Sequence, residues 1–375
     1  MRKNDIGEKA SRDDLKATCD VLVVGGGPAG ATAARQLAEA GLDVILLQKD
    51  LNYDKPCGGA LPLKAFSEFN LDESLINHTV DALRLTAPSG YPADVPLRDT
   101  PLAVVDRQTF DAHLRSLAEA AGVRLIEGRY RSMKNGVAEA VTDAGVLAVN
   151  AEYIIAADGV HSTLRKQLTG SRPARVLSLY AKVPGHLTDR CEFRFGEAVA
   201  PGHYAWVFVH KDGAHIGLGA SDEKAVHGYF ETLCRQLGLE ETPKAKGYYI
   251  PRWKDDLYRA GNVYFVGDAA GQVSPFTYEG IYYAMLSASY AAQAVIKKEP
   301  ELYERLWRAN LRRRFRAMDV LQKLMLRWNW SAEKLVRLQD NPSVRAAALR
   351  FWQGGSIPAS SFRTLIKGVK LLLRR

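Results

Sequence analysis

A glycine-rich turn near the start of the chain constrains the fold more than any other feature of the sequence. The apolar run Val21–Val24 leads directly into a glycine-rich stretch at 25–30, and an alanine-rich segment follows at 31–40. A short apolar run predicts a buried parallel strand, and the segment after it a helix. In such a strand-to-helix turn the first glycine permits the bend, the second admits a pyrophosphate and the third allows close packing. The sequence therefore predicts a Rossmann-type dinucleotide site formed by Gly25, Gly27, Pro28, Ala29 and Gly30.

The length and composition are those of an ordinary globular protein. A chain of 375 residues predicts about two domains. No apolar run approaches the roughly 18 residues that a membrane-spanning helix needs, and the polar N-terminus lacks the apolar core of a signal peptide. The four cysteines include no CxxC pair, and the eight histidines form no closely spaced cluster. We therefore expect a cytoplasmic protein in a reducing compartment, without a metal site.

Positive charge is concentrated at the C-terminal end. Residues 311–375 contain fifteen Lys and Arg against three Asp and Glu, whereas the whole chain carries a net charge of +9. The same segment is rich in leucine and tryptophan, a combination that suits the surface of an anionic membrane. A helical cap with an apolar inner face and solvated arginines explains the pattern equally well. Nucleic acid is not an expected partner, because no nucleic-acid-binding motif accompanies the charge.

Three further segments accompany the glycine-rich turn, and the four together carry a resemblance to a known family. They are Asp106–Asp111 with Arg107, the stretch Ala157-Asp158-Gly159, and the turn Gly267-Asp268-Ala-Ala-Gly271 after an apolar run at 263–266. In these four segments the chain resembles the flavoproteins typified by p-hydroxybenzoate hydroxylase and, within them, the geranylgeranyl reductase family. The resemblance implies that FAD is bound by these segments, with Asp268 accepting a hydrogen bond from a ribityl hydroxyl.

The resemblance implies an α/β fold of interleaved parts. A Rossmann-type FAD-binding domain is expected over 20–75, 100–172 and 255–300, and an antiparallel (α+β) substrate domain over 76–99 and 173–254. Alternating apolar residues, as in 191–195 and 204–209, support the antiparallel sheet. A basic helical region is expected over 301–375, and a flexible charged leader over 1–19.

Two motifs resemble the reductases rather than the related hydroxylases. The stretch Pro201–Val209 matches the reductase pattern Pro-x-x-Tyr-x-Trp-x-Phe-Pro except at Val209. Because side chains alternate along a strand, Tyr204, Trp206 and Phe208 fall on one face and are expected to contact a polyprenyl chain. The second motif, Lys55–Gly59, resembles the family's cysteine-glycine loop beside the flavin, with Cys57, Gly58 and Gly59 near the ring. Cys57 and Tyr204 are the candidate catalytic residues, because either could orient or protonate the substrate.

The segment Val273–Ile281 resembles the stretch that lies beneath the flavin ring in the geranylgeranyl reductase family. A helix beginning at Gly280 and Ile281 would direct its positive end toward the reduced flavin. Tyr278 stands where the family often has glycine, so this position is expected to narrow the substrate site. Pro275 and Tyr249 are the remaining expected substrate contacts.

Gln48 departs from the usual dinucleotide pattern. The end of the second strand normally carries a carboxylate that binds the adenosine ribose. The amide oxygen of Gln48 still accepts a hydrogen bond, but without the strength that a charge supplies. We therefore expect altered FAD affinity, with Lys49 also near the cofactor.

The resemblance implies an FAD-dependent reductase that saturates carbon–carbon double bonds of a polyprenyl group on a lipid, quinone or pigment precursor. NAD(P)H or reduced ferredoxin, a protein donor, would supply electrons, and the enzyme would lie on the inner face of a membrane. An FAD-dependent monooxygenase that hydroxylates aromatic or quinone rings would have the same FAD-binding segments and stays an alternative. A halogenase is less favoured, since Trp328-Asn-Trp330 resembles only a fragment of the halogenase motif. A prenyl-lipid-binding protein without catalytic activity is the third alternative.

Overall fold

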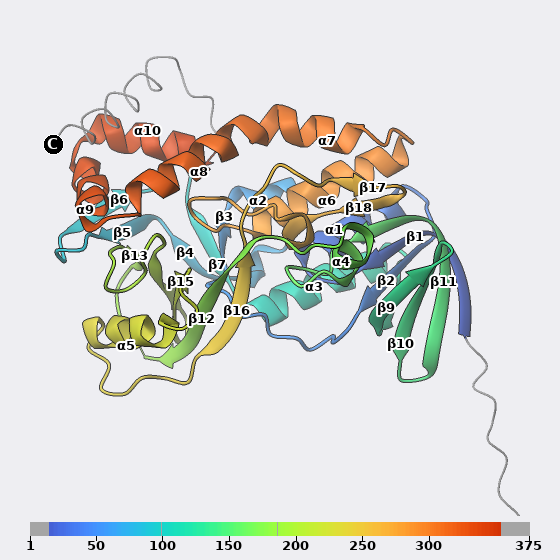
Figure 1. Cartoon of the computed structure of the whole chain (residues 1–375), viewed down its shortest axis with the longest axis horizontal. Coiled ribbons are helices and arrows are strands. Elements are labelled where there is room, and N and C mark those ends of the chain that lie inside the picture. Colours follow the sequence, from blue (N-terminus) through green and yellow to red (C-terminus); the bar gives the residue numbers. More distant parts are fainter. Residues whose placement is uncertain (1–14, 99, 186, 354–375) are drawn as a thin grey trace, which may run out of the picture.

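The computed structural model describes residues 15–98, 100–185 and 187–353. An eight-stranded sheet forms the half of the molecule on the right of Figure 1. Its centre is parallel, in the order β18-β11-β1-β2-β8, which is the arrangement expected of a Rossmann-type sheet. Its strands are β1 (Leu15–Val24), β2 (Val44–Gln48), β8 (Arg124–Glu127), β9 (Arg129–Lys134), β10 (Val137–Thr142), β11 (Gly145–Ala156), β17 (Arg259–Ala260) and β18 (Val263–Phe265).

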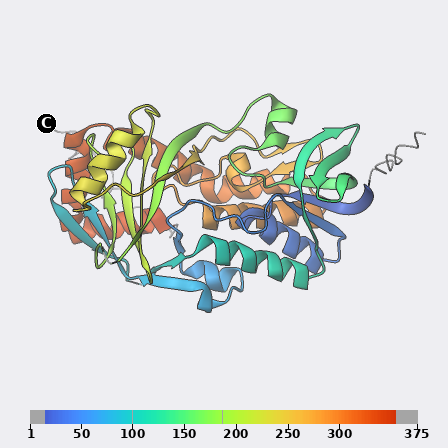
Figure 2. The ribbon, with the colours of Figure 1, turned by 90° about the horizontal axis from the view of Figure 1, so that it is seen from below.

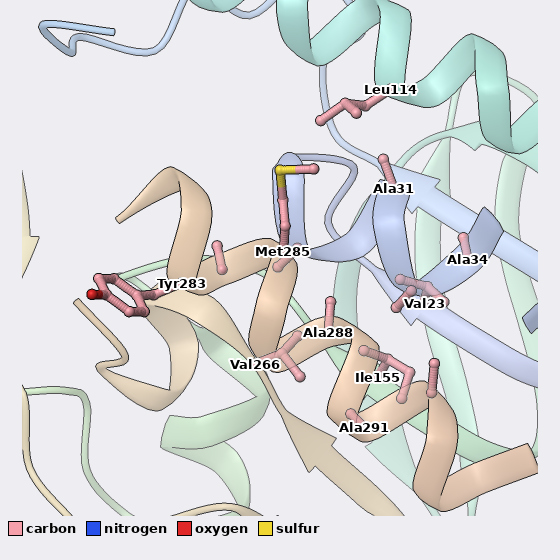
Figure 3. Close-up of a cluster of buried hydrophobic side chains, with 14 of the residues drawn as sticks. Val23, Ala31, Ala34, Leu114, Ile155, Val266, Tyr283, Met285, Ala288 and Ala291 are labelled. Carbon is pink, nitrogen blue, oxygen red and sulfur yellow. The ribbon is translucent and has the colours of Figure 1, made fainter. Parts of the chain in front are cut away.

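Small side chains let two helices approach this sheet closely. Helix α1 (Pro28–Glu39) contributes Ala31 and Ala34, and α6 (Ile281–Ile296) contributes Ala288 and Ala291, all of them fully buried. These alanines belong to one hydrophobic cluster with Val23 of β1 and Ile155 of β11 (Figure 3). Helix α3 (Arg107–Ala120) and the short helix α2 (Lys64–Glu68) contribute to the same cluster, whereas α4 (Thr163–Thr169) contributes Leu164 to a second cluster with other side chains of β1, β2 and β11.

The expected flexible leader ends earlier than the sequence suggested. Residues 15–19 form the first half of β1 and pair with 147–151 of β11 in parallel register. The reason is the length of β11, whose first half extends beyond the central sheet and offers its backbone groups to β1 as well as to β10. The prediction of a mobile leader is therefore wrong for 15–19, and residues 1–14 lie outside the described residues.

A second sheet of seven strands occupies the left half of Figure 1, in the order β16-β12-β15-β14-β13-β5-β6. Neighbouring strands are antiparallel except β13 and β5, which are parallel. The strands are β5 (Ala82–Thr86), β6 (Pro92–Pro96), β12 (Arg175–Pro184), β13 (Cys191–Arg194), β14 (Ala205–His210), β15 (Gly213–Ala220) and β16 (Lys246–Pro251). Helix α5 (Val226–Gln236) packs on one face of this sheet.

A small three-stranded sheet lies between the two large ones. It consists of β3 (Ala60–Pro62), β7 (Leu102–Val105) and β4 (Ile76–Val80), with β7 in the middle. The segment expected over 76–99 is thus divided, since β4 pairs with β7 while β5 and β6 join the seven-stranded sheet.

The C-terminal helices run along the top of the molecule and bridge its two halves (Figures 1 and 2). They are α7 (Leu302–Trp307), the π-helical stretch η3 (Arg308–Arg312), α8 (Arg313–Met325), α9 (Asn329–Arg337) and α10 (Pro342–Gln353). Three of their arginines, Arg308, Arg312 and Arg316, surround the carboxylate of Asp255 and tie the helices to the loop after β16. Among the described residues, no helix is both long enough and apolar enough to span a bilayer.

Candidate active site

A cavity of about 500 Å³ is lined jointly by residues of the Rossmann-type sheet and of the seven-stranded sheet. Most of the sequence-predicted site residues line it, although they come from segments far apart in the chain. Those residues are Gly25, Gly27, Pro28, Ala29, Gln48, Lys49, Cys57, Gly58, Gly59, Arg107, Ala157, Asp158, Gly159, Tyr204, Trp206, Phe208, Tyr249, Asp268, Tyr278, Gly280 and Ile281. Gly30, Gly267 and Pro275 do not line it.

The glycine-rich turn has the geometry that a pyrophosphate requires. Gly25 has a φ of +101°, and a Cβ at Gly30 would stand 1.7 Å from the carbonyl oxygen of Gly25, so both positions require glycine. A Cβ at Gly27 would meet no atom within 4 Å. Gly27 therefore borders open space at the N-terminus of α1, where backbone N–H groups favour an anion. These features fit the pyrophosphate of FAD.

Gln48 and Arg115 hold the backbone of this turn through hydrogen bonds to Gly26. The Gln48 amide oxygen accepts from the Gly26 N–H at 2.7 Å, while its Nε2 donates to the Asp50 carbonyl at 2.7 Å. Arg115 donates to the Gly26 carbonyl at 3.1 Å and to the Leu51 carbonyl at 2.7 Å. Sequence reasoning did not identify Arg115, whose only signal is an arginine on the buried face of a helix.

The second glycine-rich turn is joined to the Cys57 loop by an ion pair. Asp268 lies in the 3-10 turn η2 (Gly267–Ala270), and its Oδ2 is 2.7 Å from Lys55 Nζ. Burial alone would lower the pKa of Lys55, but the carboxylate of Asp268 raises it above its usual value. Lys55 also lies over the Tyr248 ring, 5.1 Å from its centroid. Lys55 was not predicted as a site residue, because only the folded chain brings it to Asp268.

The Cys57 loop lies directly against strand β14. A Cβ at Gly58 would stand 2.1 Å from the Phe208 ring, and one at Gly59, which has a φ of +81°, would be 2.2 Å from the Val105 carbonyl oxygen. His210 Nε2 is 3.2 Å from the Gly58 carbonyl oxygen. The loop therefore depends on both glycines to reach its position.

Cys57 lies beside a buried arginine. Its sulfur accepts from the Gly59 N–H at 3.4 Å and interacts with the Arg107 guanidinium. Asp111 holds Arg107 through two hydrogen bonds of 3.0 and 2.7 Å. Burial alone would lower the pKa of Arg107, but Asp111 and Cys57 raise it. Asp111 ends the matched segment Asp106–Asp111, but its role as the partner of Arg107 was not predicted.

Tyr204, which directly precedes β14, and Trp206 and Phe208 of β14 form an aromatic wall of the cavity. Tyr204 and Trp206 lie 6.2 Å apart between ring centroids, and Phe193 of β13 contacts Tyr204 at 5.0 Å and Phe208 at 5.5 Å. The Tyr204 hydroxyl donates to the Thr277 carbonyl, and burial raises its pKa well above the usual value. Phe193 was not predicted, although it completes the wall.

Behind this wall lies a second cavity of about 180 Å³. It is enclosed by β5, β6, β13 and the C-terminal helices, and it shares Phe193, Tyr204, Thr277 and Trp352 with the first cavity. Its remaining lining is almost entirely apolar: Leu83, Leu85, Val95, Phe195, Phe276, Met318, Leu321, Met325, Leu335, Leu338, Gln339, Val344, Ala348, Leu349 and Phe351. The two cavities thus meet at the aromatic wall.

Tyr278 stands at this junction in a backbone conformation that favours glycine. Its φ is +50°, and its ring lies 5.7 Å from that of Tyr204. The hydroxyl contacts His203 and accepts from Gln322 Nε2 at 2.7 Å. Glu279, the next residue, lines the first cavity and was not among the predicted site residues.

The two remaining substrate predictions have different outcomes. Pro275 is buried next to the site but lines neither cavity. Tyr249 lies at the mouth of the first cavity, with the Arg175 guanidinium 4.1 Å above its ring. The His161 ring lies 5.6 Å from the Tyr249 ring, and its Nδ1 is 3.4 Å from the Arg175 guanidinium. Burial together with Arg175 lowers the pKa of His161.

Comparisons with known proteins agree with this geometry. Residues 20–159 match the model of the FAD dependent oxidoreductase family, and residues 93–322 match that of the FAD binding domain. The predicted binding of FAD is therefore confirmed. The solved structure of a geranylgeranyl bacteriochlorophyll reductase-like protein from Thermoplasma acidophilum superimposes with a TM-score of 0.81 at 25% identity, covering 96% of this chain and 99% of that one. The predicted α/β fold is thereby confirmed as well.

Relatives that are similar in sequence identify the family of the chain more narrowly than its fold does. The chain is 33% identical over 293 residues to geranylgeranyl diphosphate reductase of Rhodobacter capsulatus, covering 74% of this chain and 75% of the relative. It is 30% identical over 332 residues to digeranylgeranylglycerophospholipid reductase of Methanocaldococcus jannaschii, covering 79% and 83%. A flavin-dependent brominase shares the fold, with a TM-score of 0.74, but only 16% of the residues. The chain belongs to the geranylgeranyl reductase family of FAD-dependent oxidoreductases.

Proposed function

We propose that this protein uses FAD to saturate carbon–carbon double bonds of a geranylgeranyl-type polyprenyl group on a lipid, quinone or pigment precursor. The observation that carries the proposal is the junction of two cavities at the aromatic wall, where the FAD-binding cavity meets an apolar one. A polyprenyl chain is a long apolar ligand that fits such a cavity. The names of the relatives, which are reductases of geranylgeranyl diphosphate and of a digeranylgeranyl phospholipid, support the same substrate class.

Each part of the site then has a chemical role. The turn at Gly25–Gly30 holds the pyrophosphate of FAD, and Asp268 with Lys55 lies beside it. When bound and reduced, FAD supplies a hydride. Tyr204, Trp206 and Phe208 pack against the alkene and exclude water, which is essential because an isolated alkene is a poor hydride acceptor. The Cys57 loop, held against Phe208 and Arg107, orients the reacting double bond.

The mouth of the cavity favours an anionic electron donor. Lys49, His161 and Arg172 line it, and Arg175 stands beside His161. We propose that NAD(P)H or reduced ferredoxin, both of which are anionic, docks on the cationic side chains of Lys49, Arg172 and Arg175. Anaerobic mixing of the FAD-loaded protein with each donor would identify it by the loss of flavin absorbance.

The corner between α8 and α9 suits attachment to the inner face of an anionic membrane. Trp328 and Trp330 are 39% and 48% exposed, and their rings stack with centroids 5.8 Å apart. Arg327 lies over the Trp328 ring at 4.7 Å and Lys334 over the Trp330 ring at 5.4 Å. Exposed tryptophan beside cationic residues is typical of a membrane interface. Helices α8 and α9 also line the apolar cavity, so a lipid substrate would enter close to the membrane.

Product mass tests the proposed reaction. The FAD-loaded protein would be supplied with a reductant and geranylgeranyl diphosphate, and the product analysed by mass spectrometry. We expect a gain of two hydrogen atoms for each saturated bond, with no dependence on oxygen. A product heavier by one oxygen atom, formed with oxygen consumption, would replace the reductase by a monooxygenase. A bound but unchanged substrate would indicate a prenyl-lipid-binding protein.

A further inference from the structure

We propose that Glu279 is the acid that protonates the alkene in this reaction. This inference rests on the proposed function and names a catalytic residue for it. Glu279 lies between Tyr278 and the helix start at Gly280, and it lines the cavity together with Thr277, Gly280 and the Cys57 loop. These residues enclose the end of the cavity where the resemblance places the flavin ring.

The Glu279 carboxyl differs from the other acidic groups of the cavity because it has no partner. Its Oε1 is buried and makes no hydrogen bond to any described residue. By contrast, Asp268 pairs with Lys55 and Asp111 with Arg107, and Asp158, although its Oδ1 is also unpartnered, accepts at Oδ2 from the N–H groups of Thr163 and Leu164 at 2.7 and 3.3 Å. A buried carboxyl without donors is more stable in its neutral form, which carries a proton.

The surroundings of Glu279 keep this proton available near neutral pH. Burial raises the pKa of Glu279 to about 7, while Arg314 and Lys64 oppose the rise. Both cations are held in place by other groups, since Arg314 donates to the Tyr283 hydroxyl at 3.1 Å and Lys64 to the Tyr282 hydroxyl at 2.8 Å. The remaining titratable groups that face Glu279 are the phenols of Tyr204, Tyr282 and Tyr283, whose pKa values burial raises, so they stay neutral. An acid with a pKa near the working pH is suited to general acid catalysis.

The other candidate acids are less suited. The Tyr204 proton is donated to the Thr277 carbonyl, and its pKa lies well above the usual value. The Tyr278 hydroxyl is held between His203 and Gln322. The Cys57 sulfur accepts from Gly59 and faces Arg107, so it is arranged as an acceptor.

The proposed step is balanced as follows. The alkene π bond breaks as one carbon receives a hydride, with its two electrons, from reduced FAD, which is thereby oxidised. The O–H bond of Glu279 breaks, and its proton forms the second C–H bond on the neighbouring carbon. Glu279 is left as a carboxylate, which water reprotonates before the next turnover.

The experiment compares wild type with E279Q and, as a matched control, with E231Q, which alters an exposed glutamate of α5, away from the cavity. Single-turnover reduction of geranylgeranyl diphosphate by the pre-reduced, FAD-loaded protein would be followed from pH 5.5 to pH 9. We expect the wild-type rate to fall as pH rises through 7, because the acid becomes ionised. General acid catalysis contributes roughly 10²- to 10⁴-fold, so E279Q is expected to be slower by at least about 100-fold and to lose this pH dependence. E231Q should retain both.

Infrared spectroscopy of the ¹³C-glutamate-labelled protein supplies a measurement independent of turnover. A protonated carboxyl band that disappears as pH rises through 7, present in wild type and E231Q but absent in E279Q, is the expected result. An active wild type with an equally active E279Q, or the absence of this band, would overturn the role of Glu279. A wild type that shows the band but reduces no polyprenyl substrate would instead overturn the proposed function on which this role depends.

Discussion

The Lys55 ammonium lies 2.7 Å from the Asp268 carboxylate, joining two segments that are 213 residues apart. This ion pair connects the Cys57 loop to the second glycine-rich turn along one wall of the FAD cavity. It therefore links the segment expected beside the flavin ring to the segment expected beside the ribityl chain.

Replacement of Lys55 tests this link. Lys55→Met leaves the Asp268 carboxylate uncompensated beside the expected ribityl chain and near the pyrophosphate, whose negative charge it then repels, so FAD affinity should fall by about tenfold or more. Because both side chains are partly exposed, the loss of folding stability should be only about 1–2 kcal/mol. Fluorescence titration of the apoprotein with FAD measures the affinity. Lys323→Met, which removes the exposed Lys323–Asp319 pair, is the matched control and should bind FAD normally.

The two glycines Gly27 and Gly30 should respond differently to alanine. Gly27 has open space around its Cβ position and a φ of −77°, so Gly27→Ala should fold normally but bind FAD at least about tenfold more weakly. Gly30→Ala places a methyl group against the Gly25 carbonyl and should destabilise the fold by about 3 kcal/mol or more. Thermal unfolding and FAD titration distinguish the two effects. Unchanged FAD affinity in Gly27→Ala would contradict the placement of the pyrophosphate.

Glu279 should make stability depend on pH. Its pKa is raised from the usual 4.5 to about 7 in the folded protein. Between these values the folded state keeps a proton that the unfolded chain releases, so stability falls as pH rises from 4.5 to 7 and then levels off. Relative to wild type, E279Q should therefore gain stability over this window, by up to about 3 kcal/mol. Unfolding midpoints in denaturant at pH 5 and pH 8 provide the measurement, and equal differences at both pH values would show that Glu279 is not perturbed.

The exposed tryptophans Trp328 and Trp330, in the corner between α8 and α9, should determine membrane attachment. The double variant Trp328→Ala/Trp330→Ala loses the exposed indole surface and should bind anionic phospholipid vesicles about tenfold more weakly in a sedimentation assay. Leu168→Ala, which removes another exposed apolar side chain on α4, is the control and should bind as wild type does. Full binding by the double variant would place the membrane contact elsewhere.

Features that depend on local spacing could be predicted from the sequence. The glycine-rich turn needs particular residues within six positions, and the alternation of Tyr204, Trp206 and Phe208 follows from strand geometry. The motif singled out the loop around Gly58, but the steric need for glycine there depends on the Phe208 ring, which only the folded chain brings to it.

Features that depend on distant partners could not be predicted. The Lys55–Asp268 pair, the parallel pairing of β13 with β5 and the apolar cavity under the C-terminal helices all require the tertiary arrangement. Glu279 was missed for the same reason, because a glutamate is unusual only when its carboxyl is buried without a partner. Pro275, expected to contact substrate, is buried beside the site rather than exposed in it.

The central claim is that reduced FAD in this cavity transfers a hydride to a polyprenyl double bond. Its most direct test is anaerobic mixing of the pre-reduced, FAD-loaded protein with geranylgeranyl diphosphate while the flavin absorbance is recorded. We predict that oxidised flavin returns without oxygen, in proportion to the double bonds saturated in the product. A flavin that stays reduced until oxygen is admitted would contradict it.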